Sequence, residues 1–439
     1  LSRKSPGEAI GYLANVLDAK IKTSDTNKII DLSGYFVNSC YLTGNYFGVK
    51  EAVDAIITNI NSTGSKISDT DLALIKTRKL NALLNIGNTE EVINIIKEEI
   101  LPDLNKELTI KQTDTSYKNL LTDAWFLSNI ALAKAYLIQG KQSVFSITAS
   151  MRDYIENNKI KSEYYNAQID IIEAFAHSTR GEVSLSNDIL TSVLEHFNDK
   201  SPDKKLLCEL NLVSIVNRIF SNQIHDLKED LFELAAFANN INEHFIKNIA
   251  KLILGYVIKQ EGNTVKALTI YNDEITYFAK EKIAIGALLS WALITEASID
   301  NGDIDMALNT ATKALEIAEG PKINNLFFII YFQKFIAQIY EIKGDFAAVK
   351  MYLEKALAVA KQNNLKYQLA HLYIDYGNYI ECLMKTQKTY SDDYIKLTLD
   401  MYNKALSIAN ELKIDYLTEK ASRERTNFKR YCQLNSIEI

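Results

Sequence analysis

Histidine and the acidic residues are the side chains with which this chain could bind a metal ion or transfer protons. No two of the five histidines lie three or four residues apart, so no helix face presents two imidazoles to a metal. Three of them adjoin an acidic residue, but adjacent side chains on a helix point about 100° apart. We therefore predict helix-surface or interhelical positions for all of them, namely His177, His196, His225, His244 and His371.

The other reactive side chains form no arrangement that catalysis requires. The pairs Glu98-Glu99 and Asp392-Asp393 fit solvated or helix-terminal carboxylates, because negative charge is favoured where a helix begins. The four cysteines form no CxxC pair, which argues against a zinc knuckle or a dense disulfide framework. Glycine-rich phosphate loops, a GxSxG elbow and an HExxH sequence are absent. We predict no enzymatic activity, no cofactor and no metal site.

Tyrosine is abundant, with 24 residues. Tyr164-Tyr165, Tyr373, Tyr376 and Tyr379 could form an aromatic surface for a peptide or for stacked bases. Tyrosine rings also fill the gaps between stacked helices while the hydroxyl reaches a polar edge. We interpret these residues as packing residues.

Helices must position all of these side chains, because strand signals are absent from the chain. Its four prolines lie between apolar helical runs rather than inside them. A glycine recurs about every forty residues between two such runs, at intervals of 43, 53, 41, 81, 40 and 42 residues. The longest interval fits two repeats around a turn at Ser221-Asn222 that lacks the glycine. The turn glycines are Gly44, Gly87, Gly140, Gly181, Gly262, Gly302 and Gly344.

Asn or Asp follows five of these glycines, as at Gly302-Asp303. A glycine in the left-handed conformation ends one helix, and the next side chain can cap the following helix. A period in this range indicates a solenoid of helix pairs, in which each pair buries its apolar face against its neighbours.

Small and aromatic residues recur at fixed distances from the turn glycines. Ala133, Ala174 and Ala337 lie seven residues upstream, and Tyr136 and Tyr340 lie four upstream. This pattern resembles the tetratricopeptide repeat, and the long step resembles the superhelices of the regulator MalT and of bacterial Rap-type proteins. The resemblance implies an all-α fold, a right-handed α-solenoid of about nine to ten antiparallel helix pairs.

The repeats are not equally regular along the chain. We expect degenerate repeats over residues 1–244, with an insertion near 102–117, and well-formed repeats over 245–412. A capping helix and tail are expected over 413–439, because the charged helix predicted from about Asp415 to Leu434 must keep one face exposed to solvent.

The first helix of each pair lines the concave side of a tetratricopeptide superhelix. The resemblance implies that residues six and three positions upstream of the turn glycines face this groove. They mix two lysines, two glutamates, two amides and two aromatics, unlike the carboxylate clamp of chaperone-binding members. The expected groove residues are Asn81, Lys134, Phe175, Tyr256, Lys259, Glu296, Gln338 and Glu341.

Composition limits the partners of this groove. A net charge of −6 argues against direct nucleic-acid binding, and the longest nearly apolar stretch, of twelve residues, is too short to span a membrane. We expect a non-catalytic scaffold for a protein or peptide, and the alternative is the sensor domain of a bacterial regulator that binds a peptide or small effector. A hydrolase within the insertion has no residue constellation behind it.

Neither the cellular location nor the oligomeric state is determined by the sequence. A cytoplasmic location is favoured, but the chain starts at Leu1 rather than at methionine, which indicates a processed or truncated start. An exported or secreted location, or an effector domain before Leu1, therefore stays open.

Overall fold

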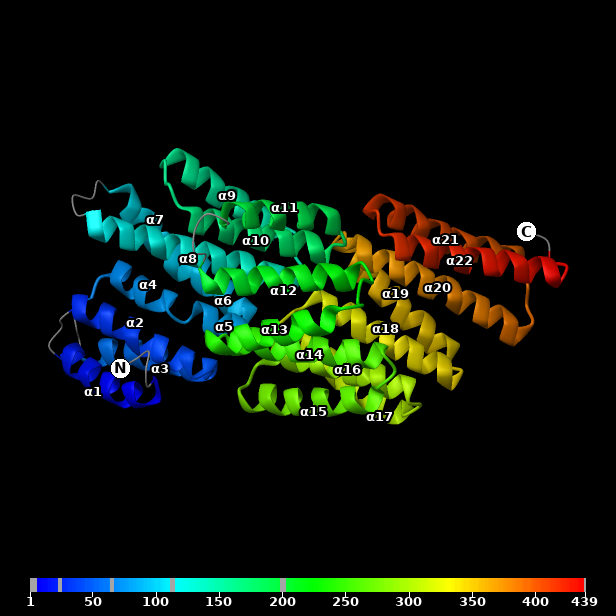
Figure 1. Ribbon diagram of the computed structural model, residues 1–439, viewed down its shortest axis with the longest axis horizontal. Coiled ribbons are helices and arrows are strands. Elements are labelled where there is room, and N and C mark those ends of the chain that lie inside the picture. Colours follow the sequence, from blue (N-terminus) through cyan, green and yellow to red (C-terminus); the bar gives the residue numbers. More distant parts are fainter. Residues whose placement is uncertain (1–5, 23–25, 64–66, 111–114, 198–202, 438–439) are drawn as a thin grey trace.

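In the computed structural model, which describes residues 6–22, 26–63, 67–110, 115–197 and 203–437, the described chain is built from helices and short turns (Figure 1). Within these ranges there are α-helices, one π-helical segment and no β-strand. The predicted all-α fold class is therefore confirmed. None of the described helices combines the length and apolar character that a membrane span needs.

The described helices form nine antiparallel pairs between an opening helix, α1 (Pro6–Lys22), and a closing helix, α22 (Asp415–Leu434). The first helices of the pairs are α2 (Thr26–Leu42), α4 (Asp69–Thr77) with α5 (Leu80–Ile86), α8 (Thr115–Gln139), α10 (Glu163–Thr179), α12 (Lys204–Phe220), α14 (His244–Gln260), α16 (Ala284–Asp300), α18 (Leu326–Lys343) and α20 (Lys366–Gln387). The second helices are α3 (Tyr46–Ser62), α6 (Thr89–Asn94) with η1 (Ile95–Ile100) and α7 (Leu101–Thr109), α9 (Ser143–Asn157), α11 (Val183–Phe197), α13 (Leu227–Asn240), α15 (Thr264–Lys280), α17 (Ile304–Glu319), α19 (Phe346–Gln362) and α21 (Asp392–Leu412).

The turns inside the pairs have the predicted backbone conformation. All seven turn glycines are left-handed, with φ between 76° and 89°, and Asn222 takes φ of 57° where the glycine is missing. Asn45, Asn263 and Asp345 cap the following helix through their side chains. The expected caps at Asn88 and Asp303 are wrong, because neither side chain makes such a hydrogen bond with the described helix that follows it.

The pairs stack with their first helices on the inner side of the curve. From α8 to α20, each first helix contacts the first helix of the next pair, and α20 contacts α22. Successive second helices do not contact one another to a similar extent in the described part of the chain. In Figure 1 the second helices α9, α11, α15 and α17 lie at the upper and lower edges, with α10, α12 and α14 between them. The inner surface is therefore built from first helices.

Each of the first four helix pairs packs against the pair that lies five pairs later in the chain, so two successive windings of the superhelix are in contact. A Cβ atom added to Gly44, in the first pair, would lie 3.1 Å from the ring of His244, which begins α14 in the sixth pair. Gly87, Gly140 and Gly181 lie in the same way against the starts of α16, α18 and α20. The turns of the first four pairs thus form one side of an interface with the last four pairs.

Hydrogen bonds follow the same five-pair offset. The backbone carbonyls of Leu42, Ile138 and Thr179 each lie two residues before a turn glycine. They accept hydrogen bonds from His244 Nε2 at 3.3 Å, Asn325 Nδ2 at 2.5 Å and Gln368 Nε2 at 3.3 Å, respectively. Each bond satisfies a carbonyl that the end of an α-helix leaves without an intrahelical partner.

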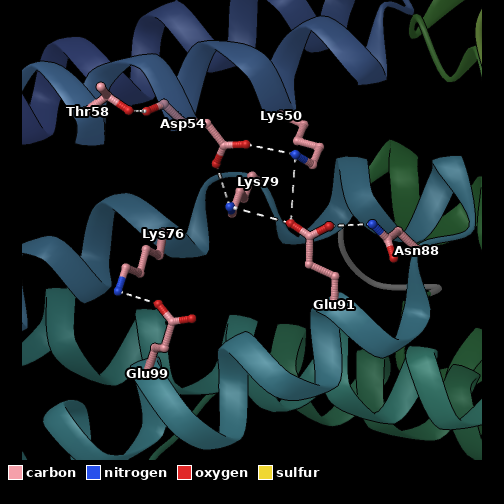
Figure 2. A network of polar contacts seen from close by, with 8 residues as sticks. All are labelled: Lys50, Asp54, Thr58, Lys76, Lys79, Asn88, Glu91 and Glu99. Carbon is pink, nitrogen blue, oxygen red and sulfur yellow. Dashed lines mark hydrogen bonds and ion pairs between the residues drawn. The ribbon is translucent and has the colours of Figure 1, made fainter. Parts of the chain in front are cut away.

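The second pair departs from the regular unit. Its first helix is interrupted at Arg78 and Lys79, and its second helix contains the π-helical segment η1 before Pro102. Figure 2 shows the ion cluster that joins these pieces to α3: Lys79 Nζ lies 2.6 Å from Asp54 Oδ1 and 3.7 Å from Glu91 Oε1. The expected insertion near 102–117 includes α7, and its residues 111–114 lie outside the described residues.

Candidate binding surface

Four consecutive first helices and the closing helix α22 place charged side chains of alternating sign along the inner surface. We call this set the charged row: Lys259 on α14, Glu296 on α16, Lys334 on α18, Asp375 on α20 and Lys420 on α22. Lys259 Nζ lies 3.4 Å from Glu296 Oε1 and 2.6 Å from Asp300 Oδ2. Lys334 Nζ lies 3.0 Å from Asp375 Oδ2. The row therefore bridges neighbouring helix pairs by ion pairs.

Aromatic side chains accompany the charged row one helical turn earlier. Residues three or four apart lie on one helix face, so each of four helices presents a ring beside its charge. We call this set the aromatic row: Tyr256 on α14, Tyr331 on α18, His371 on α20 and Tyr416 on α22. A fifth ring, Tyr367 on α20, joins it, since its hydroxyl lies 2.5 Å from that of Tyr416.

The phenols of the aromatic row are held in their protonated form by burial. Burial raises the pKa of Tyr256, and Glu296, Tyr331 and Tyr416 raise it further. Burial likewise raises the pKa of Tyr416 to about 12, so its hydroxyl stays protonated at neutral pH.

His371 is held neutral in the centre of this surface. Burial lowers its pKa well below the ordinary value, and the positive charges of Lys334 and Lys420 lower it further. Its Nε2 lies 3.2 Å from the hydroxyl of Tyr416, and its ring centroid lies 4.8 Å from that of Tyr367. The neutral imidazole therefore forms a continuous run of hydrogen bonds with the hydroxyls of Tyr416 and Tyr367.

The two lysines beside His371 differ in their partners. Burial lowers the pKa of Lys334, but the charge of Asp375 and the hydrogen bond to it raise the pKa above its ordinary value. For Lys420, burial is the largest influence and the pKa is lowered. Lys420 makes no ion pair with any residue that the structure describes, although Asp375 and Glu424 act on it electrostatically.

The eight residues predicted for the groove fall into different surroundings. Tyr256, Lys259 and Glu296 lie together in the two rows. On α18, Gln338 is exposed and Glu341 hydrogen-bonds Cys382, one turn or more beyond Lys334. Whether any of these side chains contacts a ligand stays a prediction.

The other three predicted residues lie on earlier first helices. Asn81 is exposed on α5, and Phe175 on α10 is half-buried against the core. Lys134 Nζ on α8 lies 2.9 Å from Glu209 Oε1 on α12. None of these three contributes to the charged or the aromatic row, and their ligand contacts also stay predictions.

Sequence reasoning missed Lys334, Asp375 and Lys420. Counting three or six residues upstream of the turn glycine misses Lys334, because this side chain lies ten residues before Gly344, about one helical turn further from the turn. The last pair and α22 have no turn glycine from which to count. The available signal was an aromatic residue followed by a charged one three or four positions later, repeated on successive first helices.

A second polar cluster lies on earlier inner helices. Lys205 Nζ on α12 lies 3.0 Å from Glu243 Oε1 and 3.3 Å from the hydroxyl of Tyr41. With the Lys134–Glu209 pair, both lysines of this cluster have a carboxylate partner. Among the described residues, no group of three histidine, cysteine or acidic side chains is arranged to hold a metal ion.

Comparisons with known proteins address the fold. No family model matches the chain, and no curated protein matches it in sequence. Among solved structures, it is similar to a Rap protein complexed with competence and sporulation factor, at 11% identity and a TM-score of 0.53, over 82% of this chain and 98% of that chain. This likeness shows that the chain has the tetratricopeptide-type helical-repeat fold that its sequence predicted.

Two further solved structures are similar at lower scores. Aspartyl phosphate phosphatase F from Bacillus subtilis is 14% identical, with a TM-score of 0.46 over 92% of this chain and 94% of that chain. Yeast Tom70 is 10% identical, with a TM-score of 0.37 over 96% of this chain and 89% of that chain. Both similarities are too weak to indicate a function for this chain.

Proposed function

We propose that this tetratricopeptide-type superhelix is a non-catalytic scaffold that binds an extended peptide, or an extended segment of a partner protein, along the inner faces of α14 to α22. The observation that carries the proposal is the pair of rows, in which hydroxyls, an imidazole and alternating charges repeat on successive helices. The solved structure of similar fold, a Rap protein complexed with competence and sporulation factor, is in keeping with such a role.

The spacing of the rows suits an extended chain. Packed helix axes lie about 8–10 Å apart, and an extended chain advances about 3.3 Å per residue. Successive inner helices would therefore meet about every third residue of a ligand. Repeated side-chain positions of this kind favour a peptide over a small compact substrate.

The test is binding of a pool of fluorescein-labelled random dodecapeptides to the immobilised chain. Tyr256→Leu combined with Tyr331→Leu removes two inner phenol rings with their hydroxyls, and we expect a loss of about tenfold or more in retained peptide. Phe232→Leu on the outer helix α13, where the side chain is 58% exposed, is the matched control. Retention by the double variant equal to that of the parent would contradict the proposal.

Charge reversal at Lys259 and Glu341 is a less selective test. Lys259 has a side chain that is only 7% exposed and contacts two carboxylates on α16. Reversing its charge would place three carboxylates together and disturb folding as well as binding. Removal of hydroxyls avoids this problem.

The second candidate is a sensor whose superhelix changes pitch when a peptide or small effector binds. The five-pair contacts favour it, because a ligand that spreads the inner helices would also strain the bonds from His244, Asn325 and Gln368. Small-angle scattering with saturating peptide distinguishes the two candidates. A change in the radius of gyration supports the sensor, and an unchanged radius supports the passive scaffold.

A further inference from the structure

We propose that the α22 end of the charged row is a carboxylate-binding site, in which Lys420 and the hydroxyl of Tyr416 receive a carboxylate of the bound peptide. The inference rests on the proposed peptide-binding function and names the chemical group that fixes one point of the ligand.

Lys420 lacks the ion pair that several lysines of the inner helices make. Four others have a carboxylate oxygen within 3.0 Å: Lys134 with Glu209, Lys205 with Glu243, Lys259 with Asp300 and Lys334 with Asp375. Lys420 is half-buried and has no such partner among the residues described. A half-buried ammonium group without a carboxylate is unfavourable, so an anion from a ligand would stabilise this position.

The acidic residues near Lys420 are already engaged. Asp375 Oδ2 lies 3.0 Å from Lys334 Nζ, and Glu424 Oε1 lies 3.3 Å from Arg423 Nη2. Both carboxylates act on Lys420 electrostatically, without an ion pair to it. Asp375 therefore forms its ion pair with Lys334 and not with Lys420, and the charge alternation ends on an unmatched cation.

The neighbouring groups can complete the coordination of a carboxylate. Tyr416 lies one helical turn before Lys420 on the same helix, and Tyr367 and His371 hydrogen-bond its hydroxyl. When His371 or Tyr367 donates to the Tyr416 oxygen, the Tyr416 proton is free for a ligand. An ammonium group and a hydroxyl donor side by side give a carboxylate two hydrogen bonds, of which the charge-assisted one is the stronger.

The carboxylate has two sources in a peptide, and three labelled peptide pools distinguish them. The first pool contains neutral random hexapeptides with a free C-terminus. The second contains the same sequences as C-terminal amides. The third contains amidated sequences with one Asp or Glu. Retention of the first pool alone identifies a terminal carboxylate, and retention of the third identifies an acidic side chain.

Four versions of the full-length chain are compared with each pool. Lys420→Met removes the charge and keeps the length of the side chain, and Lys420→Arg keeps the charge. Lys429→Met makes the same change at an exposed position of α22 and is the control. We expect Lys420→Met to lower affinity for carboxylate-bearing peptides about tenfold or more, while Lys420→Arg and Lys429→Met retain most of it.

The outcomes separate this inference from the function on which it rests. Equal retention of all three pools by the parent and by Lys420→Met would overturn the carboxylate site and leave peptide binding standing. No retention of any pool by the parent would overturn both. If Lys420→Met does not fold, parent affinity that is equal for the free-acid and amidated pools, with and without the acidic residue, would still overturn the site.

Discussion

The turns of the first four pairs and the turns of the sixth to eighth pairs have the same backbone conformation in different surroundings. A Cβ atom on Gly44, Gly87, Gly140 or Gly181 would lie 2.9–3.2 Å from a residue five pairs later. Around Gly262, Gly302 and Gly344 there is nothing within 4 Å of that position. The early glycines are therefore required for φ and for space, and the late ones only for φ.

The comparison shows that one repeated sequence unit serves two purposes. In the early pairs, the turns and the carbonyls just before them hold two windings of the superhelix together. In the late pairs, the same turns are free, and the distinctive side chains lie instead on the inner faces. The early pairs thus stabilise the contact between the two windings, and the late pairs contain the proposed binding surface.

The largest expected difference is between Gly181→Ala and Gly302→Ala. Either substitution places alanine at positive φ, which destabilises by about 1–2 kcal/mol. At Gly181 the new Cβ would also lie 2.9 Å from Cβ of Tyr367, and overpacking adds about 1–3 kcal/mol. Denaturant unfolding of both variants measures the difference. Equal losses of stability would show that the contacts between windings contribute little.

A second difference concerns the ion cluster of the early pairs. Lys79 is buried between Asp54 and Glu91, so Lys79→Met leaves two partly buried carboxylates with Lys50 as the remaining cation (Figure 2). We expect a loss of about 1–3 kcal/mol. Lys118→Met, on an exposed position of α8, is the control and should change stability little. Equal thermal unfolding temperatures for the two variants would show that the ion cluster contributes little to stability.

The late pairs should show a pH dependence that arises from His371. Because its pKa is lowered in the folded state, the unfolded chain binds more protons below about pH 6.5, the ordinary histidine value. Stability therefore falls as the pH decreases from about 6.5 toward the folded pKa, by at most about 1.4 kcal/mol per pH unit.

His371→Gln should remove this part of the pH dependence. His225→Gln, at an exposed position, is the control and should leave it in place. Unfolding free energies measured between pH 7 and pH 5 provide the comparison. An unchanged pH profile in His371→Gln would show that the imidazole is not held neutral.

The smallest expected effect is at Lys282, which precedes α16 and lies over a ring of the first pair. Its Nζ is 3.5 Å from the ring centroid of Phe47, and a cation–π contact of this kind contributes about 0.5–1 kcal/mol. Lys282→Met should lower stability by this amount, measured by denaturant unfolding. Lys280 has a side chain that is 81% exposed, so Lys280→Met should leave stability unchanged. Equal effects of the two substitutions would show that the contact with Phe47 does not contribute to stability.

The local parts of the fold could be predicted from the sequence. The glycine period located the turns, including the one at Asn222, and the charge-rich final helix was expected at the bounds that α22 has. The interruption at Arg78-Lys79 was not predicted, since no proline or glycine marks it. The contacts between windings were also missed, because they join residues about 190–200 positions apart and leave no periodic pattern.

The binding surface was less accessible to sequence reasoning. Distances from a turn glycine located Tyr256, Lys259 and Glu296, which do lie together. They failed where the turn glycine is missing, so Asp375 and Lys420 were not found. The domain boundaries and the groove contacts of the eight predicted residues remain predictions.

Photo-crosslinking tests the central claim most directly, namely that the ligand lies on the inner faces of the late pairs. A peptide selected from the dodecapeptide pool would carry a central benzophenone group, and the attachment site would be mapped by mass spectrometry. We expect attachment on α14, α16, α18, α20 or α22. Attachment confined to the second helices α15, α17 and α19 would contradict it.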